Sequence, residues 1–203
     1  MSRSEAMQSS QPMAQAGAAT DAAVGAPSQP LVSLSPASIR AAPGLDRIVL
    51  PSPNGSALAS ALARSGCQIL AGCLRNHTAI ATWLASQPGS LGSPPVIAVM
   101  AAGEQLPDGT LRPAAEDLWG AGGIIAALDS LGVTGLSPEA RSAAAAWRAI
   151  EQRPGPALAS CGSGAELAGA GFGGDVAIAG ELDASSCVPV LTAGRFTDAS
   201  RLS

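Results

Sequence analysis

Tyrosine and lysine are absent from this sequence of 203 residues, and aromatic residues make up only 2% of it. A hydrophobic core must therefore be built from Ala, Leu, Val and Ile. All 11 basic residues are arginine, the formal net charge is -4, and no basic stripe is present. This excludes a nucleic-acid-binding protein and a polybasic membrane-binding surface. The longest apolar runs, such as 96–102, are far shorter than the roughly 20 residues that span a bilayer.

Cysteine and histidine are also scarce. The four cysteines form no C-x-x-C pair, and His77 is the only histidine that could join them, which argues against a structural zinc site. Residues 1–21 carry Ser, Gln and Glu where a secretory signal peptide needs an apolar stretch. We therefore expect reduced, mostly buried thiols in a cytoplasmic protein.

The composition changes near residue 45. Residues 1–44 are rich in Ser, Gln, Ala, Pro and Gly and show no periodicity, so we expect a disordered or loosely attached segment. Within it, residues 1 to about 30 should be sensitive to proteases, because they offer few apolar anchors. Residues 45–203 are long enough for one α/β domain with its own core.

Short apolar runs alternate with helical patterns along this domain. The runs predict strands at 47–50, 67–71, 96–101 and 188–191, and the 3.6-residue patterns predict helices at 56–65, 77–86, 113–131 and 138–151. Gly66 stands where a left-handed helix C-cap is favoured. Such alternation is typical of βαβ units, so the predicted fold is a three-layer α/β/α sandwich with a mainly parallel sheet.

Three polar loops follow the first three predicted strands, at 51–56, 72–76 and 103–112. In open parallel sheets, ligands bind outside the carboxyl ends of the strands. Each loop leads into a helix N-terminus, whose free N–H groups and dipole favour anions. The pattern predicts a site for a small anionic ligand, a phosphorylated or sulfonated molecule, together with a hard metal ion.

Two acids stand out beside these loops. Glu116 and Asp117 fall in the first turn of the predicted helix, and ionised carboxylates are the ligands that Mg²⁺ takes, with substrate phosphate and water. The alternative is ordinary capping of a helix by acids. Glu104 and Asp108 are interpreted as solvated loop acids.

The basic and amide side chains of the loops also have two interpretations. Arg75 and Asn76 could grip a phosphate or sulfonate, or they could be an exposed arginine and an ordinary N-cap. Asn54 and Gly55 could present a backbone nest to an anion, but they also form a common turn dipeptide.

An ordered series of motifs resembles the 2-phosphosulfolactate phosphatase family over roughly residues 46–193. The motifs are Leu50-Pro-Ser-Pro-Asn-Gly-Ser56, Ala71-Gly-Cys-Leu-Arg-Asn76, Met100-Ala-Ala-Gly-Glu104, Asp108-Gly-Thr-Leu-Arg-Pro113, Glu116-Asp-Leu-Trp-Gly-Ala-Gly122 and Ser163-Gly-Ala-Glu-Leu167. Their order and spacing make the series far more specific than any one motif.

The resemblance implies a Mg²⁺-dependent phosphoric monoester hydrolase of the coenzyme M biosynthesis route. It would hydrolyse 2-phosphosulfolactate, or a similar small phosphorylated acid, to sulfolactate and phosphate. Carried over by motif, the implied catalytic residues are Glu116, Asp117 and Asn76, with Glu116 and Asp117 also holding the metal. The implied substrate-binding residues are Asn54, Gly55, Ser56, Arg75 and Arg112.

One departure from the family bears on activity. Family members begin with a strand that ends in an Asp-Val-Leu-Arg-like motif, followed by a helix, and nothing upstream of Leu31 resembles it. We therefore expect a misplaced start or a truncated homologue. An unpaired strand near 47–50 would favour self-association into a homo-oligomer. The alternative function is a catalytically inactive homologue that only binds a small anion.

Overall fold

The computed structural model describes residues 32–52, 54–89, 95–106 and 108–201. Contacts divide the chain into two compact units, Met1–Pro51 and Ser52–Ser203, which are treated separately below. The expected domain boundary after residue 44 stays a prediction. The expectation for residues 1 to about 30 falls outside the described residues.

The described part of the first unit contains one short helix, α1 (Pro36–Ala41). Ser35 caps it by accepting a hydrogen bond from the Ser38 N–H at 3.3 Å, and Pro36 occupies the first turn, where its missing N–H is harmless. The strand expected at 47–50 is not formed, and the Val49 side chain is 89% exposed. An apolar run becomes a strand only when a neighbour accepts its backbone hydrogen bonds, and the described residues of this unit supply none.

Helices of the second unit agree well with the sequence. The structure has α2 (Gly55–Leu62) continuing into a 3₁₀ turn, η1 (Ala63–Ser65), then α3 (His77–Ala85), α4 (Ala115–Ser130) and α5 (Pro138–Arg148). Gly66 adopts φ 76°, the left-handed conformation predicted for it. Ser137 caps α5 by accepting from the Ala140 N–H at 3.2 Å. The predicted helices at 56–65, 77–86, 113–131 and 138–151 are confirmed within one to three residues at each end.

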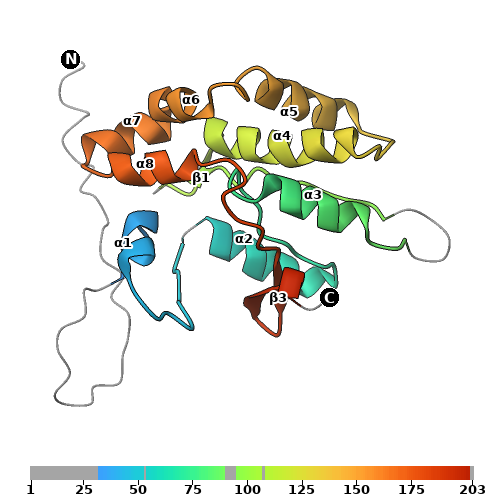
Figure 1. Ribbon diagram of the computed structural model, residues 1–203, viewed down its shortest axis with the longest axis horizontal. Helices are drawn as coiled ribbons and strands as arrows, with labels where there is room; N and C mark the ends of the chain where they lie inside the picture. The colour runs from blue at the N-terminus through green and yellow to red at the C-terminus, as the bar shows by residue number, and fades with distance from the viewer. Residues whose placement is uncertain (1–31, 53, 90–94, 107, 202–203) are drawn as a thin grey trace. The chain divides into compact units, whose positions relative to one another are not determined.

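The helix α4 lies between α3 and α5 and packs against both (Figure 1). Gly122 permits the approach of α5, because a Cβ at this position would lie only 2.1 Å from the Ala143 carbonyl oxygen. The core is built almost without aromatic residues, and Trp147 is its one buried aromatic among the described residues. Around α4 it consists of Leu74, Ile80, Ala81, Ile124, Ile125, Ala126, Leu128, Ala143, Ala144 and Trp147.

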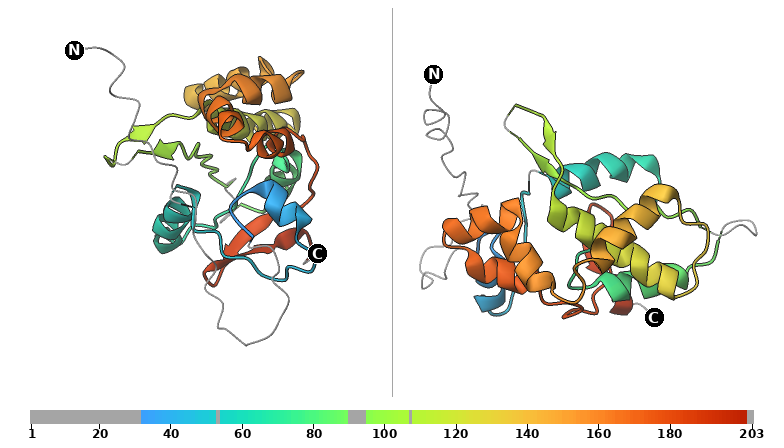
Figure 2. Two further views of the ribbon diagram at one scale, coloured as in Figure 1. Left: turned by 90° about the vertical axis from the view of Figure 1, so that its left-hand side faces the viewer. Right: turned by 90° about the horizontal axis from the view of Figure 1, so that it is seen from above.

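Three short helices follow and pack on one another: α6 (Pro154–Ser160), α7 (Gly162–Gly169) and α8 (Gly173–Ala179) (Figure 2). Gly164 allows the tight turn from α6 into α7, since a Cβ there would lie 1.8 Å from the Leu158 carbonyl oxygen.

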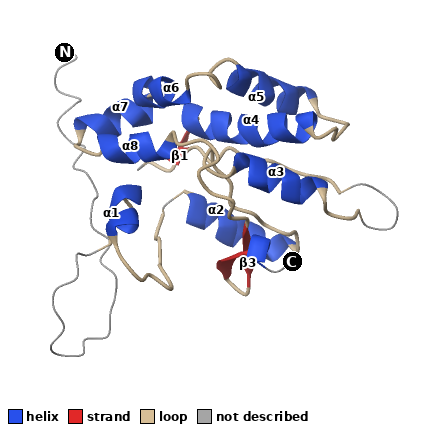
Figure 3. Ribbon diagram, viewed as in Figure 1, coloured by secondary structure: helices blue, strands red, loops and turns tan. Residues whose placement is uncertain are grey.

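Strands are few in the described residues, as Figure 3 shows. They form two antiparallel pairs, β1 (Glu104–Gln105) with β2 (Leu111–Arg112) and β3 (Pro189–Thr192) with β4 (Arg195–Asp198), and β4 runs into a 3₁₀ turn, η2 (Ala199–Arg201). Helix and strand content is thus mixed, and the strand expected at 188–191 is confirmed. The expected three-layer α/β/α sandwich with a mainly parallel sheet is not formed by the described residues.

The segment 67–71 shows why the parallel sheet is missing. Its backbone pairs in the antiparallel sense with β3: Leu70 bridges Val190, the Ala71 N–H donates to the Pro189 oxygen at 3.0 Å, and the Leu191 N–H donates to the Ile69 oxygen at 2.9 Å. One edge of this segment is therefore paired with a distant hairpin, in the antiparallel sense rather than the expected parallel sense.

The segment 96–101 is extended but forms no strand in the described structure. Ile97 and Val99 pack against the core, whereas Val96 is 99% exposed and Met100 is 54% exposed. The strand predicted at 96–101 is therefore not formed, and only one face of the segment meets packed helices. No helix within the described ranges is long and apolar enough to cross a membrane.

Candidate functional site

The hairpin formed by β1 and β2 presents a charged pair. Glu104 and Arg112 are direct partners in its register, so their side chains lie on the same face. The Arg112 Nε donates to Glu104 Oε2 at 2.8 Å, and Nη2 donates to the same oxygen. The hairpin turn is closed by Asp108, whose carboxylate accepts from the Thr110 N–H at 2.9 Å. The hairpin thus fixes the arginine beside an acid that the sequence analysis interpreted as merely solvated.

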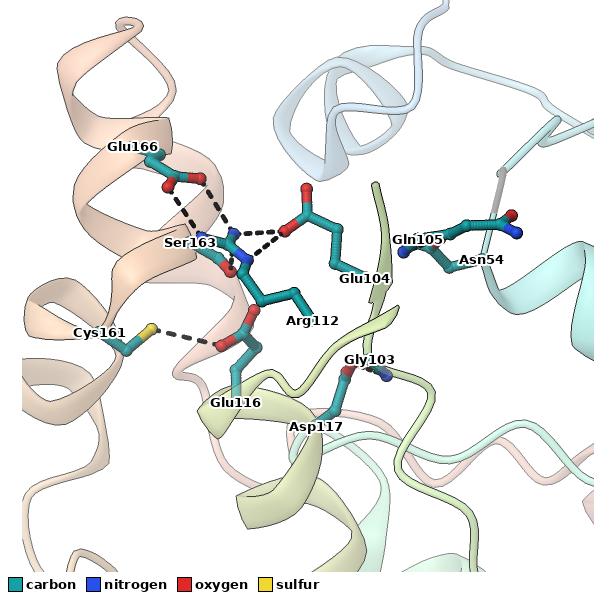
Figure 4. Close-up of polar contacts among 10 residues, drawn as sticks. All are labelled: Asn54, Gly103, Glu104, Gln105, Arg112, Glu116, Asp117, Cys161, Ser163 and Glu166. Atoms are coloured by element: carbon teal, nitrogen blue, oxygen red, sulfur yellow. Dashed lines mark hydrogen bonds and ion pairs between the residues drawn. The ribbon is translucent and has the colours of Figure 1, made fainter. Parts of the chain in front are cut away.

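Arg112 also reaches α7 (Figure 4). Its Nη1 donates to Glu166 Oε1 at 3.0 Å, and Nη2 donates to Glu166 Oε2 at 3.1 Å and to the Ser163 hydroxyl at 3.4 Å. Bonds to Glu166 and Glu104 raise the pKa of the Arg112 guanidinium further above its usual range, and the same contact with Arg112 lowers the pKa of Glu166. A permanently cationic group is therefore held between two carboxylates.

The first turn of α4 adds two more carboxylates, Glu116 and Asp117, as the sequence predicts. Asp117 Oδ2 accepts a 2.8 Å hydrogen bond from the buried Gly103 N–H. Burial raises the pKa of Asp117, the Gly103 bond lowers it, and the negative charges of Glu116 and Glu104 raise it. The loop before β1 is thereby tied to the start of α4.

Glu116 points toward Cys161, at the start of α7, while Asp117 points toward Gly103 (Figure 4). The Cys161 thiol donates to Glu116 Oε2 at 3.5 Å and to the Leu158 oxygen at 3.1 Å. Burial raises the pKa of the Cys161 thiol, and the charge of Glu116 raises it further. A thiol held protonated in this way is a hydrogen-bond donor and a poor nucleophile.

The predicted residues of the first loop lie next to this cluster. Asn54 Oδ1 accepts from the Gln105 N–H on β1 at 2.9 Å (Figure 4), and Gly55 is the first residue of α2. The Ser56 hydroxyl donates to the Ser52 oxygen within its own turn. The structure therefore connects Asn54 to the hairpin that carries Arg112.

The predicted residues of the second loop have other partners. Asn76 is buried: its Oδ1 accepts from the Cys73 N–H at 2.8 Å, and its Nδ2 donates to the Ala71 oxygen at 3.4 Å and to the Cys187 oxygen at 3.0 Å. The expected N-cap hydrogen bond of Asn76 is absent from α3. Every polar atom of its side chain thus holds backbone in place.

Arg75 is likewise engaged away from the hairpin. Its Nη1 donates to Glu181 Oε2 and to the Ile178 oxygen at 2.9 Å, both next to α8 or within it. Within the described residues, the hydrogen bonds of Arg75 and Asn76 lead to groups other than Arg112, Glu116 and Asp117. Their catalytic and substrate-binding roles stay predictions.

Sequence reasoning missed Glu104, Cys161, Ser163 and Glu166. Ser163 and Glu166 lie in the last motif of the series that resembles a known family, but their spacing in the chain gives no sign that they meet Arg112. Glu104 stands opposite Arg112 only once the hairpin is known. Cys161 carries no sequence signal that separates it from the other three cysteines. Of the four, Cys67 and Cys73 are exposed and the other two are only partly buried, so the expectation of mostly buried thiols is wrong.

The cluster offers oxygen ligands of the kind that Mg²⁺ binds. Within the described ranges, no group of three His, Cys, Asp or Glu residues forms a ready-made metal site. Mg²⁺ commonly needs only one or two carboxylates, because water and substrate phosphate complete its coordination. Glu116 and Asp117 supply two carboxylates of this kind, but in this structure they point toward different partners, Cys161 and the Gly103 N–H (Figure 4).

Comparison with known protein families gives one match. The family model for 2-phosphosulpholactate phosphatase matches residues 32–194 of the 203-residue chain. The matched range includes the β1–β2 hairpin, the start of α4 and all of α7. No curated protein matches the chain.

Proposed function

Because the chain belongs to the 2-phosphosulpholactate phosphatase family, we propose that it hydrolyses 2-phosphosulfolactate, or a similar small phosphorylated acid, to sulfolactate and phosphate with the help of Mg²⁺. In this reaction the oxygen of a water molecule forms a bond to phosphorus and the ester P–O bond breaks. The leaving alkoxide oxygen takes up a proton that the water gives up, and so becomes the hydroxyl of sulfolactate. The observation that carries the proposal is the gathering of Arg112, Glu116 and Asp117 within the matched range.

Arg112 would bind the anionic part of the substrate. Its guanidinium is planar and always charged, and its fork of N–H groups matches two oxygens of a phosphate or sulfonate. Asn54 ties the start of α2 to the strand next to Arg112, so Gly55 and Ser56 could add N–H or hydroxyl donors at that side. These residues would orient the ester for attack by water.

The charge balance favours a cation in the same place. Glu104 and Glu166 pair with the Arg112 guanidinium, and two further carboxylates, those of Glu116 and Asp117, lie close by (Figure 4). An anionic substrate would be repelled by this surplus of negative charge unless a cation bound first. Glu116 and Asp117 would hold the Mg²⁺. When bound, Mg²⁺ would neutralise phosphate oxygens and lower the barrier to displacement at phosphorus.

Cys161 is the other nucleophilic group of the cluster. Its raised pKa leaves the thiol protonated near neutral pH, so it is unsuited to form a phosphocysteine intermediate. It would instead hold Glu116 in place by donating a hydrogen bond. We therefore propose water, rather than this thiol, as the attacking group. The four cysteines, all of them in the described residues, form no disulfide bond, which is also consistent with the proposed cytoplasmic location.

Two aspartates of α4, Asp117 and Asp129, allow the proposed metal site to be tested. Asp117→Asn should reduce phosphate release from 2-phosphosulfolactate by at least roughly tenfold. Substitution of a metal ligand, or of a residue that hydrogen-bonds to one, commonly costs about 10–100-fold in metal affinity or activity. Asp129→Asn, in the last turn of the same helix and paired with Arg148, makes the same chemical change about 18 Å away along the helix. It should retain wild-type turnover. Full activity in a Glu116→Gln, Asp117→Asn double variant would remove the metal assignment.

The alternative is a catalytically inactive homologue that binds a small anion. It has its own outcome in the same experiment, namely measurable phosphate binding with no phosphate release by the wild-type chain at any Mg²⁺ concentration.

A further inference from the structure

Arg112 has all three of its side-chain nitrogens engaged by protein carboxylates. Nε and Nη2 donate to Glu104, and Nη1 and Nη2 donate to the two oxygens of Glu166 (Figure 4). The Glu166 contact is a two-pronged pairing of the kind that Arg also makes with phosphate. A phosphate or sulfonate can therefore gain the same grip on Arg112 only by taking the place of a carboxylate.

The two carboxylates differ in how easily they can leave. Glu104 is the direct cross-strand partner of Arg112, so it stays close whenever the β1–β2 hairpin is formed. Glu166 belongs to a separate helix, α7, and its side chain is 63% exposed, compared with 40% for Glu104. Exposed pairs of this kind contribute about 0.2–1 kcal/mol, because water solvates the separated charges well. Glu166 is the partner that solvent can release at small cost.

We propose that Glu166 acts as an internal competitor for Arg112, and so sets the affinity of the site for a tetrahedral oxyanion such as a phosphate or sulfonate group. This rests on the proposed function, because it assigns Arg112 as the anion-binding group. In the resting chain the carboxylate of Glu166 occupies the fork of Arg112. When the ligand binds, two of its oxygens replace the two Glu166 oxygens on Arg112, and the Glu166 side chain rotates away toward the solvent. Ser163, whose hydroxyl lies 3.4 Å from Nη2, remains to donate a hydrogen bond to the incoming anion.

Glu166→Gln tests the competition because it removes the charge but keeps the size of the side chain. Removing a competing pair worth up to about 1 kcal/mol should tighten binding of inorganic phosphate roughly two- to fivefold. Glu166→Asp keeps the charge but shortens the side chain, so it should give a smaller gain. Glu151→Gln removes one negative charge from a residue in the turn after α5 and controls for the change in net charge. It should leave phosphate affinity unchanged.

The measurement is titration calorimetry of the full chain with inorganic phosphate, and separately with inorganic sulfate, at fixed Mg²⁺ and ionic strength. Thermal unfolding of each variant is recorded in parallel. Tighter binding in Glu166→Gln with no gain in Glu151→Gln supports the proposal. A gain for sulfate alone would assign Arg112 to the sulfonate, and a gain for phosphate would assign it to the phosphoryl group or to both.

Unchanged or weaker binding of phosphate and sulfate by Glu166→Gln would overturn the proposal. If the melting temperature of this variant also fell, Glu166 would instead be a structural contact between α7 and the hairpin. The proposed function fails separately. A wild-type chain without phosphate release would refute the phosphatase function, while tighter anion binding in Glu166→Gln would still support the competition. Normal turnover with unaltered anion binding would keep the function and refute the competition.

Discussion

Three glycines of α4, at positions 120, 122 and 123, allow the packing of this helix to be tested by one kind of substitution. Glycine is about 1 kcal/mol less favourable than alanine inside a helix, so each Gly→Ala change should stabilise the chain by up to that amount if nothing else intervened. What differs is the space around each position. A Cβ at Gly120 meets nothing within 4 Å, and one at Gly123 would lie 3.5 Å from the nearest atoms of His77 and Leu74, which is ordinary contact.

Gly122 is the exception. A Cβ there would lie 2.1 Å from the Ala143 oxygen and 2.9 Å from the Trp147 Cβ, so α5 would have to move away from α4. Overpacking commonly costs about 1–3 kcal/mol, and the upper end applies because the obstacle is backbone rather than a flexible side chain. After the propensity gain, Gly122→Ala should still lose about 2 kcal/mol. Gly120→Ala and Gly123→Ala should gain up to about 1 kcal/mol.

Urea unfolding followed by circular dichroism measures these differences directly. A change of 1 kcal/mol shifts the melting temperature of a chain of this size by about 2–4 °C. The melting temperature should therefore fall by roughly 4–8 °C for Gly122→Ala and rise by up to roughly 2–4 °C for Gly120→Ala and Gly123→Ala. If Gly122→Ala proved as stable as Gly120→Ala, the close packing of α4 on α5, and with it the placement of the core, would be wrong.

Three further predictions follow from single residues. Asn76→Ala should cost about 1–3 kcal/mol in urea unfolding, because it removes the partly buried hydrogen bonds that the Asn76 side chain makes with the Cys73 N–H and the Cys187 oxygen. A loss of activity with unchanged stability would instead indicate a catalytic Asn76. Hydrogen bonds from the Val188 N–H and the Ser200 hydroxyl hold the pKa of Asp198 at about 2, below its ordinary 3.8. The contribution of Asp198 to stability is therefore present above about pH 4 and is lost as the pH falls through about 2. The stability gap between wild type and Asp198→Asn, measured by urea unfolding, should therefore be constant from pH 7 to about 4 and close at lower pH; a gap that widened on acidification would contradict this sign. Cys161 should react with iodoacetamide more slowly than the exposed Cys67 and Cys73 at pH 8, as mass spectrometry of labelled peptides would show, and a fastest-reacting Cys161 would contradict its raised pKa.

Helices could be predicted from this sequence because their signals are local. Spacing of apolar residues, Gly66 at a C-cap and Pro138 in a first turn each act within a few residues of the helix that they define. Strands depend on a partner that may lie anywhere in the chain. Of the strand predicted at 67–71 the structure forms only an isolated bridge, and neither its partner Val190 nor the antiparallel sense of the pairing follows from the run itself.

The candidate site divides in the same way. Glu116 and Asp117 were located by a local rule, the start of a helix. The pairing of Arg112 with Glu166 joins a hairpin to a helix that follows much later in the chain, and no short-range pattern reveals it. Asn76 shows the opposite difficulty. A polar residue after an apolar run can serve chemistry or hold backbone. The three hydrogen bonds of Asn76 show that it holds backbone, while its catalytic role stays a prediction.

Phosphate release from 2-phosphosulfolactate by the full chain, followed with saturating Mg²⁺ and again after removal of the metal with EDTA, tests the central claim most directly. We predict turnover with Mg²⁺, its loss in EDTA, and its recovery when Mg²⁺ is restored. Release at the same rate in EDTA would contradict the assignment of Glu116 and Asp117 to a metal ion. Absence of release from 2-phosphosulfolactate and from other small phosphorylated acids under all these conditions would contradict the phosphatase function itself.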